Sequence, residues 1–418
     1  MTAPAALTRA FADQMAQLVP EARRIGIAVS GGGDSMALLH LASGWGAARG
    51  VSIHAATVDH GLRAEAAAEQ AHVAASCAAL DLPHRPLRWT GWDGQGNLQA
   101  SAREARIALL ADWARAEALD AVCLGHTQDD QAETLLLRLM RGSGVDGLAA
   151  MSARRQRAGV LWLRPLLDQQ RETLRDYLRA ERVAWCEDPS NTDERFDRVR
   201  VRRAIDMLDL DTARLAQTAD AMRRAQDALG QRAAEVVTAG HVRFDWGEVL
   251  MDHARLAALD AETRLRLLAE AVRWVSGTAY RPRLSSLETT WARLAEGPAT
   301  LQGCLFTPER ADLRISREVS AVADLRGPIA EPWDGRWQFA WPENSAPRPA
   351  AEVRSLGAEG LKQVGRPPDG PPFASLCATP AIWQDDRVLA VPRLKWGLST
   401  RIDTQPDPSS FISSLIPH

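Results

Sequence analysis

The sequence predicts an α/β fold in which a doubly wound parallel sheet occupies residues 1–208. Short apolar segments alternate there with longer segments of helical periodicity, the order that builds βαβ units. Polar segments directly follow three of the apolar ones, at the strand ends where such sheets bind ligands. Beyond residue 208 the alternation stops, and we expect a helical domain followed by a small α+β domain at the C-terminus.

The elements of residues 1–208 each have their own signal. Apolar runs bounded by turn residues predict strands at 25–29, 51–58, 84–89 and 121–124. Apolar residues at three- and four-residue spacing predict helices at 36–48, 64–80, 98–119 and 128–140.

The rest of the chain divides by composition. Residues 209–325 are expected to form a mostly helical domain, with long helices at 212–237 and 256–275 and a hairpin at 300–317. Residues 326–350, rich in Pro and Trp, suit a linker. Short β-like segments and repeated Pro-Pro breakers predict a small third domain over 351–418.

The composition is that of a globular protein, with 46% hydrophobic and 25% charged residues. Neither a signal-peptide pattern nor a long apolar run is present, so we expect a cytoplasmic protein with no membrane partner. The five cysteines are isolated and form no Cys-x-x-Cys pair, which argues against a disulfide framework and a metal ribbon. They are Cys77, Cys123, Cys186, Cys304 and Cys377.

A glycine-rich loop joins the first expected strand to the first helix of the alternating region. Glycines allow positive φ, and the start of the helix adds unpaired N–H donors, so this context favours an anion such as phosphate. The loop lacks the lysine of a P-loop and the spacing of a dinucleotide fingerprint. It resembles the pyrophosphate-binding loop (PP-loop) of the N-type ATP pyrophosphatases, which implies ATP as substrate. The loop residues are Ser30, Gly31, Gly32, Gly33, Asp34 and Ser35.

Charge compensation at this loop has to come without lysine, because the only two lysines are Lys362 and Lys395. A carboxylate beside phosphate needs a cation between them, so Asp34 suggests Mg²⁺. The alternative is that Asp34 complements the dipole at the helix N-terminus.

A second polar cluster covers residues 125–134. If a helix begins near Thr127, the side chains of His126, Asp130 and Glu133 share one face of its first turns. Such a group can orient a nucleophile, hold a cation or accept a proton. Helix capping by Thr127 or Asp129 explains only part of it.

An arginine-rich stretch follows. Residues 154–203 hold thirteen arginines against nine acids, which makes them a candidate RNA-binding face. The alternative is a solvated helix surface of mixed charge.

Several motifs together resemble the tRNA(Ile)-lysidine synthetases. They are Gly-His-x-x-Asp-Asp-Gln-Ala-Glu-Thr at 125–134, Asp-His-Gly-Leu-Arg at 59–63, the arginine-bearing helix at 97–106, Arg-Pro-Leu-Leu at 164–167 and Glu-Asp-Pro-Ser-Asn at 187–191. The likeness is dense over the first two hundred residues and looser over 354–397. One departure is Val199, where family members commonly have asparagine.

The resemblance implies an adenine nucleotide alpha hydrolase-like fold and a two-step ligation. ATP adenylates the wobble cytidine of a CAU anticodon, and free L-lysine then displaces AMP to give lysidine, which changes decoding from methionine to isoleucine. It implies tRNA binding by residues 209–325 and 351–418. The implied catalytic residues are Asp34, Arg103, His126, Asp130 and Glu133. The implied nucleotide site is the loop together with Asp59 and His60, with Asp34 also holding Mg²⁺. The implied tRNA or substrate contacts are Arg63, Arg106, Arg141, Arg198, Arg200 and Arg202.

Other functions stay open on the sequence alone. A PP-loop tRNA thiolase would use the same loop, although its chemistry favours paired thiols. Synthesis of an amide or guanidine on a small molecule and non-catalytic RNA binding are further alternatives. The sequence predicts no protein partner and leaves a homodimer open.

Overall fold

The computed structural model describes residues 3–59, 61, 66–90, 92, 98–187, 197–278, 280–340, 351–397, 401–404 and 407–416. The chain forms two compact units, unit 1 (Met1–Gln226) and unit 2 (Asp227–Pro417). The boundary between the two units falls inside the long helix α9 (Thr212–Val236).

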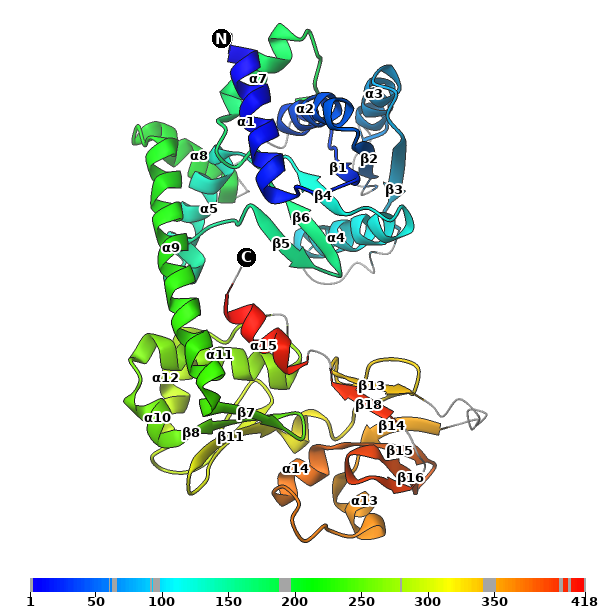
Figure 1. Ribbon diagram of the computed structural model, residues 1–418, viewed down its shortest axis with the longest axis vertical. Coiled ribbons are helices and arrows are strands. Elements are labelled where there is room, and N and C mark those ends of the chain that lie inside the picture. Colours follow the sequence, from blue (N-terminus) through cyan, green and yellow to red (C-terminus); the bar gives the residue numbers. More distant parts are fainter. Residues whose placement is uncertain are drawn as a thin grey trace. The chain divides into compact units, whose positions relative to one another are not determined.

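Unit 1 alternates strands and helices as the sequence predicts (Figure 1). Its strands are β1 (Arg24–Ala28), β2 (Ser52–Asp59), β3 (His84–Arg88), β4 (Ala121–Leu124), β5 (Arg154–Arg157) and β6 (Val160–Leu163). Its helices before α9 are α1 (Ala3–Leu18), α2 (Gly33–Arg49), α3 (Ala66–Ala79), α4 (Leu98–Ala116), α5 (Gln128–Met140), α6 (Val145–Leu148), α7 (Arg171–Ala180) and α8 (Asp197–Met207).

The strands of unit 1 form one six-stranded sheet in the order β3-β2-β1-β4-β6-β5. All neighbours pair in parallel except β5, which runs antiparallel to β6 at the edge. The doubly wound parallel sheet is therefore confirmed, with the parallel strand β6 and the antiparallel edge strand β5 added to the four strands expected. Because β1 and β4 are neighbours and parallel, the segments that follow them lie side by side at the carboxyl ends of these strands.

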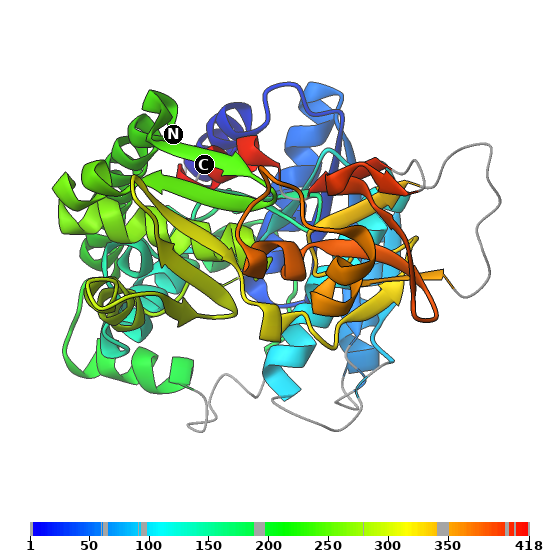
Figure 2. The ribbon, with the colours of Figure 1, turned by 90° about the horizontal axis from the view of Figure 1, so that it is seen from below.

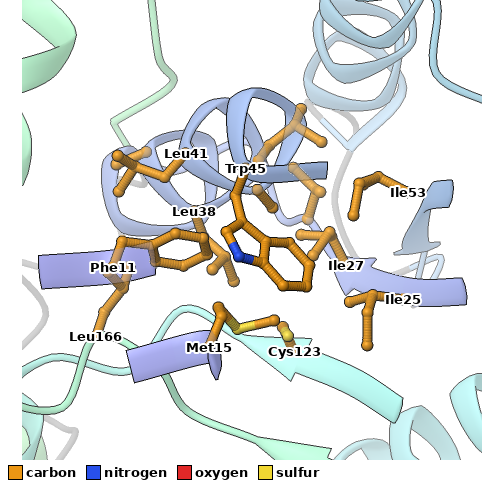
Figure 3. Close-up of a cluster of buried hydrophobic side chains, with 14 of the residues drawn as sticks. Phe11, Met15, Ile25, Ile27, Leu38, Leu41, Trp45, Ile53, Cys123 and Leu166 are labelled. Carbon is orange, nitrogen blue, oxygen red and sulfur yellow. The ribbon is translucent and has the colours of Figure 1, made fainter. Parts of the chain in front are cut away.

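Helices cover both faces of this sheet. Side chains of α1, α2, α3 and α7 pack on one face, and those of α4 pack on the other. Figure 3 shows the first layer, where Phe11 and Met15 of α1 and Trp45 of α2 meet Ile27 of β1. Both helix layers are anchored by fully buried apolar side chains, which fixes the loops at the strand ends on a rigid frame.

Unit 2 contains more strand than expected (Figure 2). Its first part has β7 (Val242–Asp245), β8 (Glu248–Asp252), β9 (Ala299–Leu301), β10 (Cys304–Pro308) and β11 (Asp312–Arg317), with α10 (His253–Ala258), α11 (Ala261–Ser276) and α12 (Leu284–Arg293). Its second part has β12 (Arg326–Pro328), β13 (Trp337–Ala340), β14 (Ala351–Ser355), β15 (Pro380–Gln384), β16 (Arg387–Val391), β17 (Trp396–Gly397) and β18 (Arg401–Thr404), with α13 (Gly357–Val364), α14 (Phe373–Ala378) and α15 (Pro408–Leu415).

Two expectations for unit 2 need correction. Residues 209–325 are not simply helical, because β7 to β11 form a five-stranded antiparallel sheet that includes the expected hairpin. The expected helix at 256–275 is two helices, since Asp260 caps α11 by accepting a hydrogen bond from the Thr263 N–H at 2.8 Å.

The expected linker at 326–350 is also partly wrong. Residues 326–328 and 337–340 are the strands β12 and β13, which pair with β14 and β18. Trp333 and Trp337 are each only 2% exposed, so the tryptophans that suggested an interdomain segment form a core instead. Residues 341–350 lie outside the described part of the chain. A membrane-crossing helix, which would have to be long and apolar, is not found among the described residues.

Candidate active site

The loop between β1 and α2 is built to receive an anion. Gly31 has φ of +88°, and Gly32 caps α2 without offering a side-chain acceptor to the first N–H groups of the helix. Ser35 Oγ donates to the Gly32 carbonyl at 2.9 Å and accepts from the Ser30 N–H at 3.1 Å. The loop is therefore closed on itself, with the helix N-terminus open for a phosphate.

The strand β4 brings a second segment against this loop. A Cβ atom added to Gly125 would lie 3.1 Å from backbone atoms of Asp34 and from Cα of Ser35. Glycine at this position lets the start of α5 approach the phosphate loop closely. The two polar clusters that the sequence singled out are thus neighbours in space.

Helix α5 begins with a capping box. Thr127 is the N-cap, and one carboxylate oxygen of Asp130, Oδ2, accepts from Thr127 N at 2.9 Å and from Thr127 Oγ1 at 3.0 Å. The capping alternative is therefore correct for one oxygen of Asp130. Its other oxygen, Oδ1, lies 3.4 Å from a guanidinium nitrogen of Arg171.

Arg171, the first residue of α7, joins the two clusters. Its Nε donates to Asp34 Oδ2 at 3.1 Å, and its Nη1 lies 3.6 Å from Glu133 Oε1. Its backbone N–H donates to Asp129 Oδ2 at 2.8 Å. One guanidinium group therefore serves carboxylates from α2 and from α5.

Glu133 is closed off from solvent by a second arginine. Its side chain is 1% exposed, and Arg202 Nε of α8 donates to Glu133 Oε1 at 2.5 Å. A carboxylate this deeply buried needs close cationic partners, because burial alone disfavours its charge. We name Asp34, Asp130, Glu133, Arg171 and Arg202 the charge cluster.

The pKa values in the cluster reflect competition between burial and charge. Burial raises the pKa of Asp34 despite the opposing charge of Arg171. Burial also opposes ionisation of Asp130, but Arg171, His126 and the Thr127 N–H together lower the pKa of that carboxyl. For Arg171 burial disfavours the charge, yet Asp130, Asp34 and Glu133 outweigh it and raise its pKa.

His126 is a neutral imidazole at physiological pH. Burial lowers its pKa to about 3, and the charges of Arg164, Arg106 and Arg198 act in the same direction, against the opposite effect of Asp130. Its Nδ1 atom is buried and finds no hydrogen-bond partner within the described chain. A buried polar atom of this kind is suited to hydrogen-bond a ligand.

The phosphate loop, His126 and Asp130 line one pocket of about 490 Å³ in unit 1, whereas Glu133 is not among its lining residues. The segment 184–187 forms a wall beside the phosphate loop: the Cys186 N–H donates to the Gly31 carbonyl at 2.9 Å, and the Trp185 ring packs beside Gly33. The lining residues are Ala28, Ser30, Gly32, Gly33, Asp34, Ser35, Glu69, Arg106, Leu124, Gly125, His126, Asp130, Arg171, Arg175, Trp185, Cys186, Glu187 and Arg202.

Some of the expected site residues lie away from this pocket. Arg103 is exposed on α4, whereas Arg106 of the same helix lines the pocket. Asp59 is not among the lining residues, and its Oδ1 accepts from the Gly61 N–H at 2.8 Å in a local turn. His60 and Arg63 lie outside the described residues.

The arginines of α8 and the end of α5 divide into two groups. Arg200 is exposed and ion-paired with Asp197 at 2.5 Å, and Arg141 pairs with the same carboxylate at 3.2 Å. Arg198 is half-buried. Arg202 points into the charge cluster and is not part of the outer face that the sequence placed it on. Helical periodicity separates Arg200 from Arg202, since positions two apart lie on opposite sides of a helix.

Arg171 is the main residue that sequence reasoning missed. Arg171 belongs to none of the motifs that the sequence analysis identified. A charge argument was available, however: Asp34, Asp129, Asp130 and Glu133 were expected at one edge of the sheet in a half of the chain without lysine, so an arginine had to neutralise them.

Comparisons with known proteins agree with this geometry. Residues 7–208 match a family model described as the PP-loop domain. The chain is 44% identical to the tRNA(Ile)-lysidine synthase of Ruegeria pomeroyi over 409 residues, covering 95% of this chain and 94% of that protein. It is 41% identical to the enzyme of the same name from Rhodopseudomonas palustris, covering 76% and 87%, respectively. It is 32% identical to that of Wolbachia pipientis wMel, covering 91% of each chain.

Proposed function

Because the chain belongs to the tRNA(Ile)-lysidine synthases, we propose that the pocket of unit 1 activates the wobble cytidine of a CAU anticodon with ATP and joins it to free L-lysine. The enzyme is a ligase that forms lysidine on tRNA(Ile). The observation that carries the assignment of this pocket is that the phosphate loop shares it with Asp130 of α5 and with Arg171, which also contacts Glu133. An ATP-dependent ligation to an amine requires both parts side by side.

The loop and the start of α2 bind the phosphates of ATP. Their N–H groups, together with the hydroxyls of Ser30 and Ser35, offset the charge that develops when the bond between the α and β phosphates breaks. Arg106 lines the same pocket and supplies positive charge to the phosphates in a part of the sequence that contains no lysine.

Asp34 is the residue that would hold Mg²⁺. Magnesium prefers one or two carboxylates together with phosphate oxygens, and Asp34 stands in the first turn of α2 beside the loop. The residues present fit a magnesium ion, because Asp34 offers a carboxylate whose negative charge is balanced by the guanidinium of Arg171. When bound, the ion would supply charge neutralisation to the phosphates.

Asp130 and Glu133 bind the ammonium group of lysine. Two buried carboxylates on successive turns of α5 form an amine subsite of opposite charge. His126, with its pKa of about 3, remains neutral and hydrogen-bonds the substrates rather than storing the proton that the amine loses.

The tRNA contacts fall on exposed arginines. Arg141 and Arg200 are exposed, and with half-buried Arg198 they offer positive charge to a phosphate backbone. Residues 209–325 and 351–418 remain our proposed further tRNA-binding regions. The thiolase alternative is disfavoured because four of the five cysteines are buried, and burial raises the pKa of Cys77 to about 11 and of Cys123 to about 12.

A direct test is to incubate the enzyme with ATP, radiolabelled lysine and unmodified tRNA carrying a CAU anticodon. We expect lysine in the tRNA, with AMP and pyrophosphate released in equal amounts. The variant Glu133→Gln should abolish lysine incorporation, and Glu172→Gln, on the exposed surface of α7, should retain it. Incorporation of sulfur, or ATP turnover without lysine transfer, would contradict the assignment.

A further inference from the structure

Arg171 occupies the position that a substrate amine would need. It lies within 3.1–3.6 Å of carboxylate oxygens of Asp34, Asp130 and Glu133. The side chains of Asp130 and Glu133 are 8% and 1% exposed, so few approaches to their oxygens remain. An ammonium group that binds the same oxygens has to take the place of the guanidinium.

The charge cluster contains one more carboxylate than guanidinium groups. Three carboxylates face two guanidinium groups, those of Arg171 and Arg202, so the five side chains of the cluster carry one net negative charge. Arg202 is held by Glu133 at 2.5 Å, whereas the three contacts of Arg171 are longer. Each single contact of Arg171 is therefore longer than that of Arg202, but the three together hold its charge, so its release requires a competing anion of high charge.

The position of Arg171 also connects the amine subsite to the nucleotide. Its Nε contacts Asp34 of the phosphate loop, while its two Nη atoms face α5. Triphosphate oxygens arriving at the loop offer this guanidinium a bidentate partner of higher charge than a carboxylate. The backbone of Arg171 stays fixed through Asp129, so only the side chain has to move.

We propose that Arg171 is an internal counter-ion that fills the amine subsite of the nucleotide-free enzyme and moves to the phosphates when ATP binds. This inference rests on the proposed function, because it takes lysine as the amine. ATP then unmasks Asp130 and Glu133, and lysine binds tightly only to an enzyme that holds ATP. Arg171 acts as a positioning residue, through the carboxylates that it covers and releases.

The experiment measures lysine binding by calorimetry with and without the non-cleavable analogue α,β-methylene-ATP. For the natural enzyme we expect the analogue to raise lysine affinity at least about tenfold. The variant Arg171→Gln should bind lysine without the analogue, and the analogue should change its affinity by less than about threefold. Arg171→Lys keeps the charge and should keep the dependence. Arg179→Gln, two turns along the same helix in an exposed ion pair, is the matched control and should behave as the natural enzyme.

Three results would overturn the inference: no effect of the analogue on lysine binding by the natural enzyme, full dependence in Arg171→Gln, or loss of lysine binding in both states of a folded Arg171→Gln. Should that variant not fold, the natural enzyme still tests the inference, because an analogue that leaves lysine affinity unchanged excludes a counter-ion that ATP displaces. Failure of the proposed function looks different, since the natural enzyme would then bind no lysine in either state and transfer none to tRNA.

Discussion

The ion pair between Glu133 and Arg202 allows a quantitative test of how burial changes the value of a charge contact. The same helix, α8, carries a second arginine pair, Arg200 with Asp197, and both pairs have an N–O distance of 2.5 Å. The side chains of the inner pair are 1% and 30% exposed, and those of the outer pair are 49% and 62% exposed. The N–O distance and the helix that carries the arginine are therefore matched. The pairs differ in burial, and the carboxylate lies on α5 in the inner pair and on α8 in the outer pair.

We expect Arg202→Gln to lower the free energy of unfolding of unit 1 by about 2–4 kcal/mol, because it leaves a buried carboxylate with the more distant guanidinium of Arg171. Arg200→Gln should cost at most about 1 kcal/mol, as exposed pairs do. In a double-mutant cycle with Glu133→Gln, the coupling energy of the inner pair should be about 1–3 kcal/mol.

Urea unfolding of the full chain, followed by circular dichroism, measures these values. Unit 2 contains none of the substitutions, so its transition is an internal standard. Equal losses for Arg202→Gln and Arg200→Gln, or a coupling energy below about 0.5 kcal/mol, would refute the claim that burial makes the inner pair dominant.

Three further predictions follow from single residues. Since the pKa of His126 is depressed to about 3, its neutral form stabilises the fold fully above the unfolded value near 6.5, and that stability falls as the pH is lowered. Between pH 6.5 and 5 the natural enzyme should therefore lose about 1–2 kcal/mol more than His126→Asn in urea titrations, and equal losses would exclude a buried neutral imidazole. Arg200→Glu should weaken tRNA binding and leave ATP binding unchanged. The slope of log affinity against log salt concentration should fall by about 1 for each phosphate that the protein no longer neutralises. An unaltered salt slope in filter binding would place the tRNA elsewhere. Gly125→Ala should destabilise unit 1 by about 1–3 kcal/mol and weaken ATP binding, because the new Cβ meets the backbone of Asp34. Gly44→Ala, at a position that faces open space within α2, should be neutral or stabilising. The same change in Tm for both variants would contradict the close approach of Gly125 to Asp34.

The sequence was most informative where a local pattern decides the structure. Alternation of strand and helix patterns located β1 to β4 and α2 to α5 to within a few residues, and the limits of α5 were predicted to the residue, but β5 and β6 were not predicted. The phosphate loop was identified from its glycines because backbone conformation at Gly31 depends mainly on the residue itself. Helical spacing grouped Asp130 with Glu133, and both carboxylates contact Arg171 in the structure.

It was less informative for unit 2. The strands β7 and β8 lie between helix-forming stretches. They pair with each other, and β8 also pairs with β11, about sixty residues away in sequence. The tryptophans between residues 328 and 350 suggested a linker, whereas Trp333 and Trp337 are core residues. Burial of a large aromatic side chain depends on what packs against it, which composition does not reveal.

The sequence by itself determined the fold class, the phosphate loop and the residue types that an ATP-dependent ligation to an amine requires. Only the tertiary structure decided how those charges are paired. It placed Arg106 in the pocket but not Arg103, turned Arg202 inward from Arg200, and put Arg171 between two helices that are separate in sequence. The physical reason is that glycines, caps and periodicity act over a few residues, whereas a buried carboxylate is stabilised by whichever cation the whole fold brings within a few ångströms.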